Sequence, residues 1–249
     1  MAAQQGFEYE KNAANILKPM GIVPKNFIPA GAGHDQPDLI IEHKGKSSGC
    51  ELKITAASAG SLVLKYDTKN KRNPWSFGKI SEDDAEKKFI QDLADEVGLF
   101  DIIKKQWKEM PFKRDKDELW NATAGKLTKK QQYERDRDTF PDIRGEIQAS
   151  KIEQYYNRKD TYYVNVGTHG FYMMGTKNPL KLDNVPTFAS AAKAIYRARV
   201  QYKGNDNYQF TFEMQFSIPS SKKSQFNIAP VDGKSVRILK DKLDLSCFI

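Results

Sequence analysis

The segment QPDLIIEHKGKSSGCELKI, residues 36–54, constrains the fold more than any other part of the chain. Two short apolar runs, DLII and CELKI, flank the polar, glycine-containing stretch KGKSSG. Short apolar runs on either side of a turn sequence are typical of a β-hairpin. We therefore predict a strand over 38–42, a hairpin turn at KGKSSG and a returning strand over 50–55.

Three charged residues lie on or beside these runs: Asp38, Glu51 and Lys53. Glu51 and Lys53 are two positions apart, so a strand would place both side chains on one face and Leu52 on the other. If the two strands pair, Asp38 and Glu51 meet at one end of the sheet. A structural interpretation is that Asp38 caps a turn and that Glu51 and Lys53 form a cross-strand charge pair on a solvated face. The apolar flanks favour a functional site, because charges in a buried sheet are costly without a partner.

Two carboxylates held close together repel each other unless a cation lies between them. Mg²⁺ and Mn²⁺ prefer oxygen ligands, so Asp38 and Glu51 are candidate metal ligands, with the backbone carbonyl of Leu52 as a further one. Such an ion lowers the pKa of a bound water and neutralises charge on a phosphodiester. Lys53 would orient or deprotonate the attacking water and stabilise the added negative charge. The segment therefore predicts metal-dependent phosphodiester hydrolysis.

The composition favours a globular protein with a polyanionic partner. The chain has 249 residues and a net charge of +8, and nucleic acid is the commonest partner of such a basic chain. Its two cysteines make neither a disulfide framework nor a zinc-ligand spacing. The sequence has no phosphate-loop, HExxH or CxxC motif, which argues against nucleotide hydrolases and proteases. It also shows no signal peptide and no membrane span, so we expect a cytoplasmic protein without a membrane partner.

The pattern of PD followed after a hairpin by ELK resembles the signature of the PD-(D/E)xK nuclease superfamily, which includes type II restriction enzymes and archaeal Holliday-junction resolvases. The stretch EKNAANIL, which begins at Glu10, is similar to the first helix of the resolvase-like branch. GIVPKNFIPAGAGHDQPD resembles the first strand and the glycine-bearing loop that precede the metal-binding aspartate. The resemblance covers residues 6–66, and it implies a metal-binding role for Glu10, with Glu8 as the competing acid.

The resemblance also implies the fold class: α/β (α+β), with a restriction-endonuclease-like mixed sheet core flanked by helices. We expect a single domain over 1–249, with the nuclease motifs in 6–66. A charged helical insertion would follow at about 81–160, and C-terminal strands over 161–249, including a β-hairpin.

Hydrophobic periodicity adds individual elements to this layout. It predicts a first helix over 7–18, a third strand of the core sheet over 61–66, helices over 82–107 with a break at Gly98, and a C-terminal β-hairpin over 194–218.

The function expected from these patterns is that of a Mg²⁺-dependent (or Mn²⁺-dependent) DNA endonuclease. An exonuclease and a catalytically inactive nucleic-acid-binding protein on the same scaffold are the alternatives. A homodimer is expected more weakly, because duplex DNA is nearly two-fold symmetric. Basic residues and an exposed-looking tryptophan suit contact with phosphates and bases. The residues expected to contact DNA are His34, Gln36, Lys65, Tyr66, Lys69, Lys71, Arg72 and Trp75.

Overall fold

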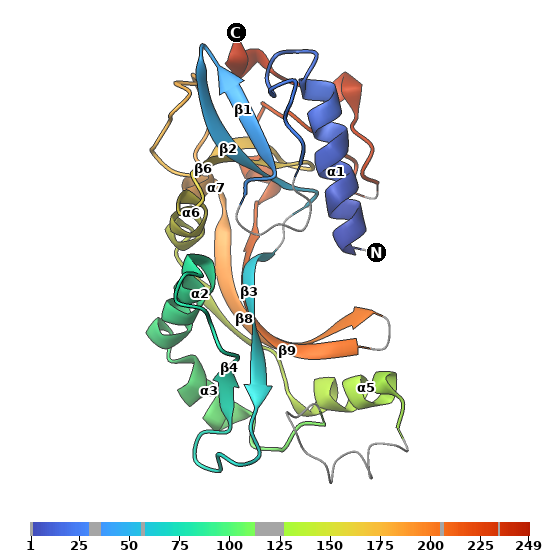
Figure 1. The fold of residues 1–249 in the computed structure, drawn as a ribbon, viewed down its shortest axis with the longest axis vertical. Coiled ribbons are helices and arrows are strands. Elements are labelled where there is room, and N and C mark those ends of the chain that lie inside the picture. The colour runs from blue at the N-terminus through green and yellow to red at the C-terminus, as the bar shows by residue number, and fades with distance from the viewer. Residues whose placement is uncertain (1, 30–35, 56–57, 113–126, 205–206, 234) are drawn as a thin grey trace. The chain divides into compact units, whose positions relative to one another are not determined.

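The chain separates into two compact units, each with its own β-sheet. The computed structural model describes residues 2–29, 36–55, 58–112, 127–204, 207–233 and 235–249 (Figure 1). Unit 1 comprises 1–57, 148–194 and 216–249, and unit 2 comprises 58–147 and 195–215. Unit 1 therefore contains Glu10, Asp38, Glu51 and Lys53. The prediction that the whole chain is a single domain stays a prediction.

The sheet of unit 1 has four strands in the order β1-β2-β6-β7. The β1–β2 and β6–β7 pairs are antiparallel, and the central β2–β6 pair is parallel. The predicted mixed sheet is therefore confirmed. The strands are β1 Leu39–His43, β2 Lys46–Lys53, β6 Thr161–Val166 and β7 Gly170–Met173.

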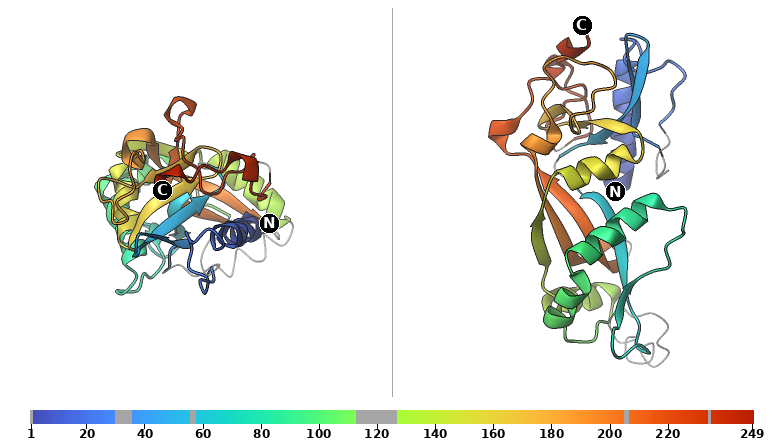
Figure 2. Two further views of the ribbon diagram at one scale, coloured as in Figure 1. Left: turned by 90° about the horizontal axis from the view of Figure 1, so that it is seen from above. Right: turned by 90° about the vertical axis from the view of Figure 1, so that its left-hand side faces the viewer.

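Helices cover both faces of this sheet. Helix α1, Ala2–Leu17, buries Tyr9, Ala13, Ala14 and Leu17 in a core that also contains apolar residues of β1 and β2. Helix α6, Ser150–Asn157, lies on the other side of the sheet (Figures 1 and 2). Every residue of β6 is buried, as expected for a strand that is covered on both faces. The remaining helical pieces of unit 1 are α7 Phe188–Ala191, η1 Ser220–Lys222, η2 Lys240–Lys242 and η3 Ser246–Phe248.

The β1–β2 turn is shorter than the sequence predicts. Lys44 and Gly45 have φ angles of 48° and 74°, the positive values that a two-residue hairpin turn requires. Ser47 and Ser48 continue the ladder by pairing with Glu42 and Ile41. The prediction that the whole KGKSSG stretch forms the turn is therefore wrong, because pairing resumes immediately after Gly45.

A buried polar network fixes α1 against β6. The Tyr9 hydroxyl donates to the carbonyl of Ala229 at 2.5 Å and accepts from Asn165 Nδ2 at 3.2 Å. The Ile228 amide donates to Asn165 Oδ1 at 3.0 Å. Buried hydrogen bonds of this kind hold one arrangement of the chain, because breaking one leaves a polar group unpaired. The network therefore sets the position of α1, on which Glu10 lies.

Unit 2 contains a five-stranded sheet in the order β4-β3-β9-β8-β5. The predicted third strand belongs to this sheet as β3 and not to the sheet of β1 and β2, so that assignment is wrong. The predicted C-terminal hairpin is confirmed as β8 and β9. The strands are β3 Ser58–Tyr66, β4 Trp75–Phe77, β5 Ile143–Ile147, β8 Lys193–Gly204 and β9 Asn207–Ser217.

The helices of unit 2 occupy the predicted charged segment, which also holds a strand. Helices α2, Ala85–Glu96, and α3, Leu99–Gln106, are separated at Gly98, whose φ of 64° favours glycine. Helix α5 spans Lys129–Thr139. Strand β5 follows it, although the sequence indicated only helix and loop there. Among the described residues, no helix has the length and hydropathy needed to cross a membrane.

Substituting alanine for either of two glycines in unit 1 should change the free energy of unfolding, with opposite signs at the two positions. A Cβ at Gly167 would lie 2.6 Å from Val231 Cγ2 and 2.8 Å from Tyr9 Oη, whereas a Cβ at Gly6 of α1 meets nothing within 4 Å. Gly167→Ala should lower the free energy of unfolding by about 1–3 kcal/mol through overpacking. Gly6→Ala should raise it by about 0.5–1 kcal/mol, because alanine favours the helix. Urea unfolding measures both, and changes of the same sign would contradict the packing described here.

Candidate active site

Asp38 lies directly before β1, at the end of the sheet. The pairing of Leu39 with Cys50, extended by one residue, places Asp38 opposite Glu51. The amide of Leu52 donates to Asp38 Oδ2 at 2.8 Å. The structure therefore brings Asp38 and Glu51 to the same end of the strand pair, as the sequence predicts.

Glu51 and Lys53 point to the face opposite Cys50 and Leu52. Lys53 Nζ donates to Glu51 Oε1 in an ion pair. Glu51 is only 7% exposed, while Cys50 and Leu52 belong to the core shared with α1. The structural interpretation, a charge pair across strands on a solvated face, is therefore wrong. The pair lies within one strand and is largely withdrawn from water.

Glu10, on helix α1, is the third acidic residue that the sequence predicted for the site. Its side chain is half-buried, one residue after the buried Tyr9, whereas Glu8 is exposed. Burial raises the pKa of Glu10 to about 7, the positive charge of Lys53 lowers it, and the negative charge of Glu51 raises it further. Glu10 is thus within electrostatic reach of both residues of β2, which favours it over Glu8.

The pKa of Asp38 is raised to about 8, and several causes act on it. Burial is the largest cause, and the negative charges of Glu51 and Glu10 add to it. Lys53 and the Leu52 amide act in the opposite direction. Burial would lower the pKa of Lys53, but Glu51, Asp38 and Glu10 together raise it above its ordinary value. The amine therefore stays protonated.

Lys53 is within electrostatic reach of three carboxyl groups, those of Glu51, Asp38 and Glu10, so full ionisation of all four groups leaves an excess of negative charge. Carboxylates are the ligands that Mg²⁺ and Mn²⁺ prefer, and the donor set suits such an ion in chemistry and charge. Among the described residues, however, no three His, Cys, Asp or Glu side chains are grouped closely enough to hold a metal. Glu51 is engaged by Lys53 instead. Metal binding by Asp38, Glu51, Glu10 and the Leu52 carbonyl stays a prediction.

The residues expected to contact DNA are distributed over both units. His34 lies outside the described residues, and Gln36 is exposed in unit 1. Tyr66 is half-buried on β3 in unit 2. The basic residues of the group are all exposed in unit 2: Lys65, Lys69, Lys71 and Arg72.

Trp75 is not the exposed tryptophan that the sequence predicted. It is 7% exposed and packs against Trp107 and Phe210, with ring centroids 5.1 and 4.9 Å away. Its pairing with Tyr66 across the β3–β4 hairpin places it in the aromatic core of unit 2. An open surface for base stacking at Trp75 is therefore excluded.

Sequence reasoning missed Tyr9 and Asn165, which position the site without contacting it. The signal was present: Asn165 is the one amide side chain in the strand TYYVNV, which is mostly apolar and aromatic and is entirely buried. A buried amide needs partners, and Tyr9 and Ile228 supply them.

Comparison with known proteins gives one distant likeness. No protein-family model matches the chain, and no curated protein matches it. Among solved structures, the chain is similar to HhaI endonuclease in complex with DNA, at 10% sequence identity and a TM-score of 0.42. The similarity covers 85% of this chain and 90% of that one. At this level it assigns no residue, so the functional assignment rests on the geometry of the site.

The carboxyl cluster predicts that the protein loses stability as the pH rises. The pKa values of Asp38 and Glu10, about 8 and about 7, exceed those of unfolded chains. The folded state therefore binds more protons, and the free energy of unfolding should fall between about pH 4 and pH 8. In EDTA, Asp38→Asn should reduce this fall by at least about 1.4 kcal/mol, the equivalent of one pKa unit.

Urea unfolding at stepped pH values measures this change. Asparagine keeps an oxygen that can accept from the Leu52 amide, so the substitution removes mainly the charge. Glu42→Gln, on the exposed face of β1, is the matched control and should leave the pH dependence as it is in the wild type. The cluster described here is wrong if Asp38→Asn and the wild type lose stability equally.

Proposed function

We propose that this protein is a Mg²⁺- or Mn²⁺-dependent DNA endonuclease of the PD-(D/E)xK type with a restriction-endonuclease-like core. One observation carries the proposal: Asp38 lies opposite Glu51 at the end of a buried strand pair, and the Lys53 amine contacts Glu51. These are the residue types and spacing of the PD…ExK pattern. A surface charge pair would not need a buried carboxyl group and two half-buried ones close to the same amine.

Asp38, Glu51, Glu10 and the carbonyl of Leu52 would hold the divalent ion. When bound, the ion supplies a water of lowered pKa and neutralises charge on the phosphodiester. The bond between the Leu52 amide and Asp38 fixes which oxygen of that carboxylate faces β2. Occupation by a dication would also relieve the repulsion that burial imposes on these carboxylates.

Lys53 supplies the fixed positive charge of the site. Its side chain is mostly withdrawn from water, with 21% exposed, and its pKa is raised by the neighbouring acids. A protonated amine in such a setting donates hydrogen bonds and stabilises negative charge on a phosphate oxygen more strongly than it would in water. In this proposal Lys53 orients or deprotonates the attacking water and stabilises the added negative charge.

A basic surface on unit 2 supports DNA as the substrate. Lys65, Lys69, Lys71 and Arg72 are exposed on β3 and on the loop that joins it to β4. Basic side chains that neutralise phosphates supply most sequence-independent affinity for DNA. The net charge of +8 agrees with this role.

The substitution Lys53→Ala tests the assignment. It should reduce Mg²⁺-dependent cleavage of plasmid DNA by at least about 100-fold, because the site loses its one fixed cation. DNA affinity, measured by fluorescence anisotropy in Ca²⁺ or EDTA, should change by less than about threefold. Lys46→Ala, an exposed lysine at the start of the same strand, is the control and should cleave normally. Full activity of Lys53→Ala would refute the proposal.

Incubation with supercoiled, linear and branched DNA in Mg²⁺ or EDTA distinguishes the proposed activity from its alternatives. Nicking or linearisation of closed circular DNA in Mg²⁺ alone is the expected result for an endonuclease. Degradation of only linear DNA would identify an exonuclease. Salt-sensitive binding without any cleavage in Mg²⁺ or Mn²⁺ would identify a binding protein on this scaffold.

A further inference from the structure

A pocket of unit 2 lies between the β3–β4 loop and helix α3. Its volume is about 310 Å³, within the range of small-ligand sites. The loop is held in one shape by its own side chains: the Lys69 amide donates to Asp67 Oδ1 at 2.8 Å, and the Asn73 amide donates to Asn70 Oδ1 at 3.0 Å. The Asp67 amide also donates to the Pro74 carbonyl at 2.7 Å. One wall of the pocket is therefore preformed.

Charge in the pocket has one sign. Lys71 and Arg72 line it from the loop, Lys104 from α3 and Lys108 from just beyond that helix, and none of the described residues that line it is acidic. None of these four cations forms an ion pair within the part of the chain that the structure describes. Four uncompensated cations around one cavity favour an anionic ligand.

Four aromatic residues also line the pocket. Phe100 and Trp107 share one face of α3 with Lys104, at helical spacings of three and four residues. Tyr66 and Trp75 line the pocket from the β3–β4 hairpin, with ring centroids 5.2 Å apart. Tyr66 and Phe100 are half-buried, so part of each ring remains accessible, while both tryptophans are buried behind them.

The two tryptophans differ in their hydrogen bonds. Trp107 Nε1 donates to the Pro141 carbonyl at 2.9 Å. Trp75 Nε1 is buried and has no acceptor among the described residues. An unpaired buried donor is unfavourable and uncommon in folded proteins. The indole N–H of Trp75 is thus a polar group of a pocket-lining residue without a hydrogen-bond acceptor among the described residues.

We propose that this pocket binds a nucleotide, with the base against the accessible rings of Tyr66 and Phe100 and the phosphate among the four cations. Bases stack on aromatic side chains, and lysine and arginine bind phosphate, so both halves of the ligand have a partner here. Tyr66, Lys71, Arg72 and Trp75, which the sequence suggested as DNA contacts, meet at this one place. The inference goes beyond the proposed hydrolysis, because the residues of the pocket and those of the acidic cluster belong to different units.

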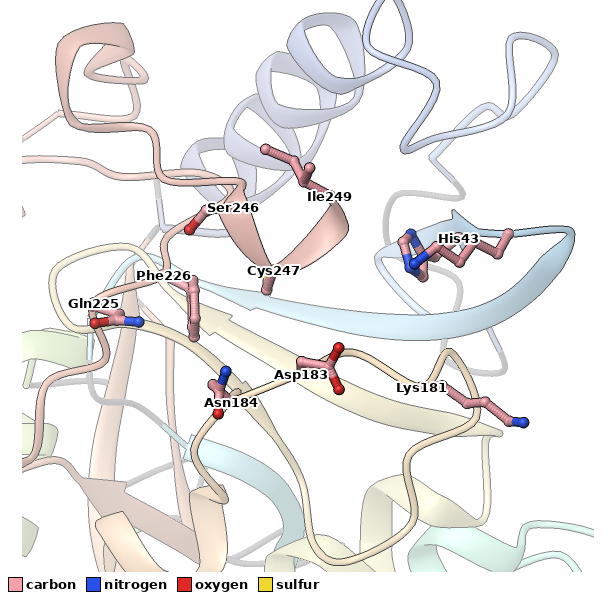
Figure 3. Close-up of a pocket in the computed structure, with 10 residues that line it drawn as sticks. His43, Lys181, Asp183, Asn184, Gln225, Phe226, Ser246, Cys247 and Ile249 are labelled. Atoms are coloured by element: carbon pink, nitrogen blue, oxygen red, sulfur yellow. The ribbon is translucent and has the colours of Figure 1, made fainter.

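A pocket of unit 1 serves as a comparison. It is lined from the β1–β2 hairpin, the 181–184 segment and the C-terminal segment (Figure 3). Asp183 lines it together with Lys44 and Lys181, so its charges are of both signs. The unit 1 pocket therefore lacks the purely positive charge and the aromatic wall of the unit 2 pocket. We do not propose that it binds a nucleotide.

Titration of the full chain in EDTA, followed by calorimetry, tests the proposal. The probes are deoxyadenosine 5′-monophosphate, deoxyadenosine and inorganic phosphate. The nucleotide should bind saturably and at least about tenfold more tightly than either fragment, because it uses both the rings and the cations. Absence of saturable nucleotide binding would overturn the proposal, as would phosphate binding as tightly as the nucleotide.

Two neighbouring lysines of α3 give a matched pair of variants. Lys104 lines the pocket and Lys105 does not, although both are exposed. Lys104→Glu should weaken nucleotide binding at least about tenfold, and Lys105→Glu by less than about twofold. Equal losses would show a diffuse charge effect and would overturn the proposal. Thermal unfolding checks that both variants fold.

Two further binding measurements test whether the ligand is a free nucleotide or part of a DNA strand, and whether this inference holds independently of the proposed function. Tighter binding of pentadeoxyadenylate than of the mononucleotide would assign the pocket to a unit of a DNA strand, and the reverse would assign it to a free nucleotide. Lys53→Ala should bind the mononucleotide as the wild type does. Nucleotide binding without cleavage by the wild type would therefore refute the hydrolytic function alone, and cleavage without nucleotide binding would refute the pocket alone.

Discussion

The structure of unit 1 depends on holding like charges together away from water. Asp38, Glu51 and Glu10 share one ammonium, that of Lys53, and burial raises the pKa of Asp38 and of Glu10. Such an arrangement does not stabilise itself, so other interactions must hold the elements in place. The two-residue β1–β2 turn fixes the register, and the Tyr9–Asn165 network holds α1 against β6. The packing of the core therefore offsets the repulsion between the carboxylates at the end of the sheet.

The two units concentrate charge of opposite sign. Unit 1 has acids in excess at the end of β1 and β2, whereas the pocket of unit 2 has cations without acids. Excess negative charge in unit 1 favours a cation, and excess positive charge in the unit 2 pocket favours an anion.

Sequence reasoning was most successful where the signal was local. The hairpin and the meeting of Asp38 with Glu51 follow from alternation and a short turn, both contained in a few neighbouring residues. It failed where partners are distant: β3 alternates as a strand should, but its pattern does not reveal that it pairs with β9. Trp75 looked exposed because basic residues precede it, yet the hairpin directs it into the aromatic core. Strand β5 was hidden in a charged stretch because only one of its residues is fully buried.

The parallel pairing of β2 with β6 has a consequence for how the chain folds. Gly49 pairs with Thr161, and the whole first segment of unit 2 lies between them in sequence. The hairpin of β1 and β2 can close early through local contacts, but its neighbouring strand leaves the ribosome only after that segment. Until β6 arrives, the inner edge of β2 is an open row of backbone donors and acceptors. During synthesis the β1–β2 hairpin, with Asp38 and Glu51, is therefore exposed to non-native strand pairing before Asn165 of β6 is available to hold α1 in place.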